Sequence, residues 1–459
     1  MSECVQLLSG SSTHPIHTYF SDIMSKLSDC SLSGDLQPNL RRHINPCRWL
    51  AVVSFVALLL FRASHVPDSL IGRPTDHHRP ADRWKTLHLK PKPVQPAFVH
   101  PGVLVSDAQL QYVKAQITAG AEPWNAAMEQ FTASNYTQLI WEPKPRAVVE
   151  CGSSSYPDLG CKDERKDAIA AYSLALRFYL SGDAAYAQKS IEIMDAWATT
   201  LTGHNNSNAP LQTGWAGASW PKAGELIRNY YPQWNSDQQG RFQDMLRNIY
   251  LPELLPGSTS NGNWELVMME AAIGMAVHLE DQDSLDSALA TFNTRLPAYV
   301  YLQSDGDLPK TVPKQHLKSR QQIVNFWQGQ ETFFDGITQE TCRDFVHAGY
   351  GLASIANIAE TMRIQGDDLY TSTDLGERLY AALELHTGLE NGEEVPADLC
   401  GGQVTLGLKN ITEVGYNALH KRMQYDMPNT QIYTENGRPE DTNFLFIAWQ
   451  TLTHAEQPN

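Results

Sequence analysis

Four side chains able to carry charge or move protons recur at short intervals in an otherwise apolar stretch. They are spaced three, four and three residues apart: Glu340, Arg343, His347 and Tyr350. On a helix this spacing puts all four on one face. The flanking residues are mostly apolar, so the helix they predict is a buried one. A cation, an imidazole and a phenol in line on such a helix indicate a reaction site.

The chemistry that fits this set is removal of a proton next to a carboxylate. In β-elimination from a 4-linked uronate, the C5 proton can be removed once the neighbouring carboxylate is neutralised. Arg343 would supply the cation, and Tyr350 would take the C5 proton and return one to O4. A free tyrosine has a pKa of about 10, so a working base needs a lowered pKa, which a nearby guanidinium favours. A structural alternative stays open, in which Arg343 forms a buried ion pair with Glu340 or Asp344.

Asn263 and several aromatic residues could complete such a site. Asn263 precedes an apolar helix, where an asparagine either caps the helix or donates its amide to a substrate carboxylate. Aromatic faces stack on sugar rings, although packing within a loop is the alternative for each tryptophan. The expected substrate-binding residues are Gln212, Trp215, Trp220, Trp264, Tyr299, Tyr301 and Glu340.

Helical hairpins are expected to position these residues. Asp163–Ser181 has an acidic first turn and an apolar stripe, Gly182 ends it, and Asp183 caps a second helix over Ala184–Thr200. No alternating strand run is convincing. Repeated hairpins joined by long irregular loops predict an all-α fold, an (α/α)n toroid or incomplete α/α barrel, with a binding cleft at its mouth. Further helices are expected at Pro221–Tyr230, Asp237–Leu251, Trp264–Leu279, Ser284–Thr294, Asp374–Thr387 and Thr442–Thr453.

The N-terminal part divides into three segments ahead of the expected catalytic domain at 98–459. Residues 1–48 are Ser-rich and predict a disordered cytosolic leader, and 62–97 is a Pro-rich linker. The apolar run 49–61 is shorter than the roughly 20 residues that span a bilayer comfortably. With arginines before it, it matches a signal-peptide core or a signal anchor, and a buried core helix is the alternative. The domain is therefore expected to be secreted, or anchored outside the cell.

Sequons and cysteines agree with export. Three glycosylation sequons follow the apolar run, at Asn135, Asn205 and Asn410. Four cysteines also follow it and predict two disulfides, Cys151 with Cys161 across a short loop and Cys342 with Cys400. A buried free thiol remains the alternative for Cys342.

Charge and motif content limit the partners. The 459-residue chain is 42% apolar and carries a net charge of −16, which argues against nucleic-acid binding. An acidic polysaccharide substrate would need a local cleft of Arg and Lys within this acidic chain. The sequence contains no HExxH, no paired CxxC and no phosphate-binding glycine loop, so neither a metal nor a cofactor is expected.

Two of these motifs together resemble a known group of enzymes. Asn263-Trp-Glu before one apolar helix, and Arg343-Asp-x-x-His347-x-x-Tyr350 at the head of another, resemble the alginate lyase-like α/α-toroid polysaccharide lyases, of the family 5 and family 38 types. The resemblance covers about 98–370. It implies that Asn263 and Arg343 neutralise the substrate carboxylate, that Tyr350 is base and acid, and that His347 assists. Family 5 enzymes have a histidine directly after the asparagine, where this chain has Trp264, so glucuronan and alginate both stay open as substrates.

Two other functions are compatible with the sequence. A glycoside hydrolase on the same toroid would need two carboxylates facing each other across the cleft. A non-catalytic sugar-binding protein would bind without turnover. Release of an unsaturated uronate separates the lyase from both. The carboxylates available to a hydrolase are Glu265, Glu331, Asp335, Glu340 and Asp344.

Overall fold

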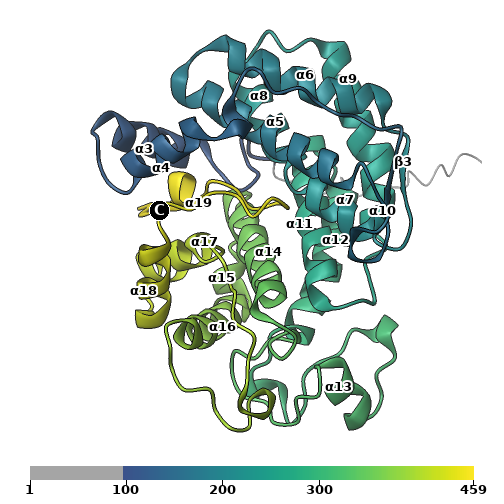
Figure 1. The fold of residues 1–459 in the computed structure, drawn as a ribbon, viewed down its shortest axis with the longest axis vertical. Helices are drawn as coiled ribbons and strands as arrows, with labels where there is room; N and C mark the ends of the chain where they lie inside the picture. Colours follow the sequence, from purple (N-terminus) through teal and green to yellow (C-terminus); the bar gives the residue numbers. More distant parts are fainter. Residues whose placement is uncertain (1–96, 459) are drawn as a thin grey trace, which may run out of the picture. The chain divides into compact units, whose positions relative to one another are not determined.

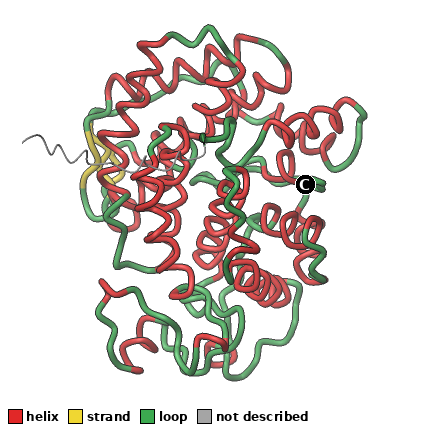
Figure 2. The backbone as a smooth tube through the Cα atoms, turned by 180° about the vertical axis from the view of Figure 1, so that it is seen from behind, coloured by secondary structure: helices red, strands yellow, loops and turns green. Residues whose placement is uncertain are grey.

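The structure is a computed structural model that describes residues 97–458. The predicted segments 1–48 and 49–61, and nearly all of 62–97, lie outside the described residues. Within 97–458, no helix combines the length and apolarity needed to cross a bilayer. Helices make up most of the regular structure (Figure 1), and strands are confined to one small region (Figure 2).

The helices are α3 (Asp107–Thr118), α4 (Trp124–Ala133), α5 (Cys161–Ser181), α6 (Ala184–Thr200), α7 (Ala209–Gly217), α8 (Trp220–Tyr230), α9 (Ser236–Met245), α10 (Leu251–Leu254), α11 (Gly262–Leu279), α12 (Gln282–Arg295), α13 (Arg320–Phe326), α14 (Phe345–Ile364), α15 (Leu369–Ser372), α16 (Leu375–Glu390), α17 (Glu413–Tyr416), α18 (Pro428–Gly437) and α19 (Gln450–His454). The strands are β1 (Val148–Cys151), β2 (Asp158–Leu159) and β3 (Gly203–Asn205), in the order β2-β1-β3. These strands are only two to four residues long, too short to give an alternating pattern in the sequence.

The first predicted hairpin is confirmed. Gly182 ends α5 in the left-handed conformation, with φ of 74°, which glycine adopts without steric cost. The Asp183 side chain then caps α6 by accepting a hydrogen bond from the backbone N–H of Ala185 at 2.9 Å. The chain therefore reverses at this corner, and α5 packs along α6.

Successive helices pack on one another and the last returns to the first. Helix α11 contacts α7, α12 and α14, and nearly all its residues are buried because its sequence is apolar on every side. Helix α19 packs on α3 and α4, where the Nε2 atom of His454 lies 3.0 Å from the Leu104 carbonyl oxygen. The predicted all-α toroid is confirmed, and the described helices close it end to end.

One predicted helix is wrong. Only the end of the segment expected at Thr442–Thr453 is helical, as α19, and residues 441–448 form a loop that we call the strap. The Asn443 side chain accepts hydrogen bonds from the backbone N–H groups of Leu445, Phe446 and Ile447, at 2.9–3.0 Å. These bonds hold the backbone in a turn that competes with the helix. The strap joins α18 to α19 and reaches the upper end of α14 (Figure 1).

Both predicted disulfides are present, Cys151–Cys161 and Cys342–Cys400. Cys342 lies in the turn before α14, between Glu340 and Arg343, and Cys400 lies in the long loop between α16 and α17. The second disulfide therefore ties the turn that carries two predicted site residues to a distant part of the chain.

Replacing Cys342 and Cys400 together by Ser should destabilise the protein more than the matched change at Cys151 and Cys161. The two bonds span 58 and 10 residues. The loop-entropy relation gives losses in the free energy of unfolding of about 4 and about 3 kcal/mol, respectively. Urea unfolding of the two double variants measures the difference. Equal losses, or a larger loss at the short loop, would contradict the prediction.

Candidate active site

Glu340 is the centre of the predicted site and is completely buried. Both of its oxygens accept from the Asn263 side-chain amide, at 2.7 and 2.6 Å, and one accepts from the backbone N–H of Asn263 at 3.1 Å. Arg343 donates to the other oxygen at 2.7 Å. The structure thus brings Asn263 and Arg343 together. Two expectations are corrected. Glu340 is too buried to bind a sugar, and the amide of Asn263 donates to Glu340 and not to a substrate carboxylate.

The predicted helical row of Glu340, Arg343, His347 and Tyr350 is only partly helical. Helix α14 begins at Phe345, so Glu340 and Arg343 lie in the turn before it, while His347 and Tyr350 lie on the helix. Asp344 is the N-cap, and its side chain accepts from the backbone N–H of His347 at 2.8 Å. Aspartate favours this position because its carboxylate satisfies an unpaired N–H group of the first turn. The four residues nevertheless remain in one chain of contacts.

His347 links Arg343 to Asp344. Its Nε2 atom lies 2.9 Å from Nη2 of Arg343, and its Nδ1 atom lies 2.8 Å from Asp344. A guanidinium can only donate, so Nε2 accepts and the ring proton sits on Nδ1, facing the carboxylate. This arrangement fixes the tautomer and the orientation of the imidazole. The side chains of Arg343 and His347 are each 32% exposed, so a substrate can reach them.

Tyr350 lines a cavity of about 300 Å³, together with Lys409, Asn410 and four strap residues. Its ring meets the His347 ring edge-on at 5.8 Å between centroids, and Phe446 packs on it at 6.2 Å. Burial raises the pKa of the Tyr350 phenol, the Asp344 carboxylate raises it further, and Arg165 opposes them. The expected net lowering is therefore wrong for the free protein. The guanidinium that acts in the expected direction is Arg165.

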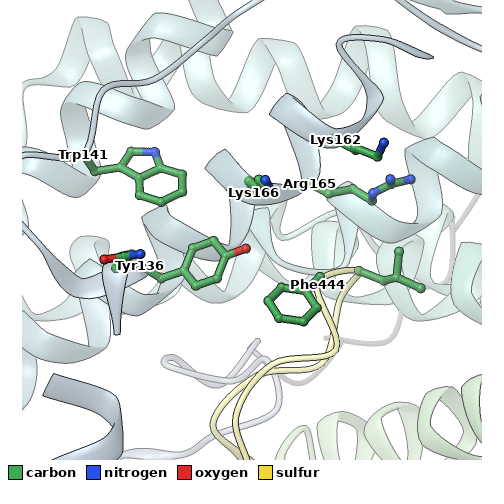
Figure 3. A pocket seen from close by; sticks show the side chains of 8 residues that line it. Tyr136, Trp141, Lys162, Arg165, Lys166 and Phe444 are labelled. Atoms are coloured by element: carbon green, nitrogen blue, oxygen red, sulfur yellow. The ribbon is translucent and has the colours of Figure 1, made fainter. Parts of the chain in front are cut away.

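A second cavity of about 530 Å³ lies on the other side of the strap. Its cationic residues come from α5, and its aromatic residues come from the segment after α4 and from the strap. Figure 3 shows most of these side chains around the cavity. Tyr136 and Trp141 pack with ring centroids 5.1 Å apart. The lining residues are Asn135, Tyr136, Trp141, Lys162, Arg165, Lys166, Phe444 and Leu445. The local basic cleft that an acidic substrate requires is therefore present in this acidic chain.

Arg165 belongs to this cleft but was not among the site residues predicted from the sequence. It is 6% exposed, and among the described residues no carboxylate forms an ion pair with it. Its Nη1 atom donates to Gln212 at 2.8 Å, its guanidinium lies 5.1 Å from the centroid of the Trp215 ring, and its buried Nε has no partner. A buried charge without a counter-ion is costly unless it binds one. Arg165 is therefore placed to receive an anion.

Gln212 and Trp215 hold Arg165 in place. The Gln212 amide is fully used, because its oxygen accepts from Arg165 and its nitrogen donates to the Cys161 carbonyl and to Glu164, at 2.9 and 2.6 Å. Glu164 also lies 2.7 Å from Nε2 of His204. The expectation of direct substrate contact is corrected for Gln212, which positions Arg165 instead.

Three expected aromatic contacts are wrong. Trp220, Tyr299 and Tyr301 are almost completely buried, so their ring faces cannot reach a sugar. The Trp220 indole donates to the Tyr250 hydroxyl at 2.8 Å, and the Tyr301 hydroxyl donates to the Gly306 carbonyl at 2.6 Å. Trp264 is partly buried and packs against the core. The aromatic residues that the sequence suggested as sugar contacts therefore belong mainly to the core.

The carboxylates considered for a hydrolase do not form a pair across either cavity. The lining of the larger cavity contains none, and that of the smaller contains only Asp441. Glu265 is buried in ion pairs with Arg295 and Lys314. Residues 97–458 also contain no group of three or more His, Cys, Asp or Glu side chains that could hold a metal ion.

The sequons lie on the surface of the described chain, and two of them border the cavities. Asn135 lines the larger cavity, Asn410 lines the smaller one, and Asn205 ends β3. All three side chains are exposed.

Comparison with known proteins gives a consistent result. The alginate lyase family profile matches residues 157–393. No curated protein sequence matches the chain. A histidine-to-alanine variant of alginate lyase A1-III, complexed with a tetrasaccharide, is similar in structure with a TM-score of 0.54 and 15% identity, over 80% of this chain and 98% of that chain. A tyrosine-to-phenylalanine variant with tetrasaccharide gives 0.53 and 16%, over 80% and 99%. Alginate lyase A1-III from Sphingomonas species A1 gives 0.50 and 13%, over 79% and 98%.

Proposed function

The chain belongs to the alginate lyase family and is a polysaccharide lyase, and we propose that it cleaves a 4-linked uronate polysaccharide, of the alginate or glucuronan type, by β-elimination at Tyr350. One observation carries the proposal. Tyr350 lies between His347 and the strap and next to a basic, aromatic cleft, and the rise that burial causes in its pKa is opposed by Arg165, a buried cation with no ion pair among the described residues. The family match favours an alginate, and alginate lyase A1-III binds a tetrasaccharide.

The proposed reaction begins with neutralisation of the substrate carboxylate. Arg165 and the exposed part of Arg343 bind it, which stabilises the negative charge that develops as C5 loses its proton. Asn263 and Glu340 hold Arg343 in position from behind. His347, fixed by Asp344, keeps its ring edge beside the phenol and orients Arg343.

Tyr350 then carries out both proton transfers. Its phenolate takes the C5 proton, the electron pair of that bond forms the C4–C5 double bond, and the C4–O4 bond breaks. The phenol returns the proton to O4 of the leaving chain. The products are a shortened chain and a chain with an unsaturated uronate at its new end. No water is consumed, in contrast to hydrolysis.

A substrate panel tests the function. Residues 98–459, which we propose as the catalytic domain, are secreted from a eukaryotic host and incubated with polymannuronate, polyguluronate, glucuronan and a neutral glucan. We expect the ultraviolet absorbance of the unsaturated uronate to increase with at least one uronan and not with the glucan. New reducing ends without that absorbance would establish hydrolysis instead.

The rate should increase with pH. Because burial and Asp344 raise the pKa of Tyr350, little phenolate exists at neutral pH, and kcat/KM should rise about tenfold per pH unit below that pKa. Asp344→Asn removes the negative charge but keeps a residue that caps α14, so the rise should move to lower pH. Asp335→Asn, at an exposed position, is the control. A pH-independent rate, or a shift to higher pH in Asp344→Asn, would contradict the assignment of Tyr350 as base.

We further propose that the domain works outside the cell. Two disulfides favour an oxidising compartment, and three exposed sequons are available for glycosylation. Mass spectrometry of the N-terminal peptide, from the membrane fraction and from the medium, tests whether 49–61 is cleaved or retained as an anchor.

A further inference from the structure

Phe444, at the tip of the strap, is held in an unusual position. Its φ of 61° lies in the left-handed region, which a large side chain rarely adopts. Its side chain is 58% exposed, the largest exposed fraction of any phenylalanine in the described chain. Both features are unfavourable for an isolated loop, and such features persist where the surrounding structure enforces them, often at functional sites.

The strap enforces them through its own contacts. The Asn443 side chain fixes the turn that carries Phe444, and Thr442 pairs with Ala448 in an antiparallel bridge. Phe446 packs on Tyr350, and its carbonyl oxygen lies 3.5 Å from Nζ of the buried Lys222. The strap is thus pinned to the toroid beside the proposed base, and Phe444 projects from it.

Phe444 lines both cavities of the site. On one side lie Tyr350 and Lys409. On the other lie the cations of α5 and the Tyr136–Trp141 pair, and Figure 3 shows Phe444 facing this group. A phenylalanine between two cavities that each carry a cation offers an apolar face to a sugar ring and charges to the carboxylates on both sides.

We propose that Phe444 is a substrate-binding ridge: one pyranose ring stacks on it, and it divides the cleft into two uronate subsites. The subsite at Tyr350 and Lys409 holds the sugar that reacts. The subsite at Lys162 and Lys166 holds a uronate farther along the chain, while Arg165, which lies between the two lysines in sequence and acts on the pKa of Tyr350, binds the carboxylate of the reacting sugar. This inference rests on the proposed function and adds to it that a substrate long enough to cross the ridge binds more tightly than one that fills only the subsite at Tyr350.

The test compares Phe444→Ala and Phe444→Tyr with a matched control, Ile432→Ala on α18, whose side chain is 53% exposed. The substrates are uronate oligomers of two to six residues, of whichever uronan the wild type cleaves. Phe444→Ala should raise KM for the hexamer at least tenfold and leave KM for the shortest cleaved oligomer within twofold. Phe444→Tyr should restore the wild-type KM, because it keeps the aromatic face. Thermal unfolding confirms that each variant folds.

Wild-type KM for every oligomer in Phe444→Ala would overturn the ridge while leaving the lyase function in place. An equal loss for short and long oligomers would overturn the division into two subsites. If the wild type cleaves no uronan, calorimetric titration with a hexamannuronate and a hexaglucuronate separates the two proposals: binding that Phe444→Ala weakens tenfold supports the ridge, and unchanged or absent binding overturns it.

Discussion

Replacing Tyr350 by Phe should lower kcat/KM on the preferred uronan by about 10³-fold, which corresponds to about 4 kcal/mol of transition-state stabilisation. The expected size follows from the double role that we propose for the hydroxyl, which would take the C5 proton and protonate O4. The ring itself should stay in place, because Phe keeps the packing against His347 and Phe446. KM should change little, since the hydroxyl acts mainly in the transition state.

Tyr380→Phe on α16 is the matched control, because Tyr380 packs against Tyr425 away from both cavities and should lose nothing. Absorbance of the unsaturated product gives the rates, and thermal unfolding checks both folds. Retention of more than a tenth of the activity in Tyr350→Phe would move the base to another group, with His347 the first candidate.

The sequence predicts the fold well because local signals and tertiary packing agree. The α5–α6 corner is an example, where Gly182 and Asp183 each have a local reason for their conformation. Prediction fails where a side chain redirects the backbone. Asn443 turns an apolar segment into the strap. Asp344 caps α14 after Arg343, so Glu340 and Arg343, which were expected on the helix, precede it.

The site is only partly predictable, because spacing identifies neighbours along the chain but not across the fold. Arg343, His347 and Tyr350 are close in sequence, and their contacts follow. The use of Asn263 by Glu340 joins positions 77 residues apart, which no local pattern reveals. The sequence around Arg165 did contain a pattern that could have identified it. It shares a helix face with Ile169 and Tyr172, both buried, and a cation on an apolar face is unusual.

The charges around Arg343 explain why Arg165 should matter as much as the residues that the sequence indicates. Arg343 is paired with Glu340 at 2.7 Å, and Asp344 lies 3.9 Å from its Nε, so its positive charge is already compensated. Arg165 has no such partner among the described residues, and its charge lowers the pKa of Tyr350 against the effects of burial and Asp344. In the proposed reaction, we therefore expect the neutralisation of the substrate carboxylate to depend mainly on Arg165.

Arg165→Gln should accordingly reduce kcat/KM by about 10²–10³-fold, the range found when one preorganised donor to a developing charge is removed. It should also move the alkaline rise of the rate to higher pH, since the guanidinium lowers the pKa of Tyr350. Arg165→Lys keeps the charge and should recover part of the rate, while Arg241→Gln, in a surface ion pair on α9, should be neutral. The pH profile separates this role from simple packing against Trp215, because a packing defect lowers the rate without shifting the profile. If Arg165→Gln keeps both the rate and the profile, Arg343 must neutralise the carboxylate despite its pairing, and Glu340 would then have to release it when substrate binds.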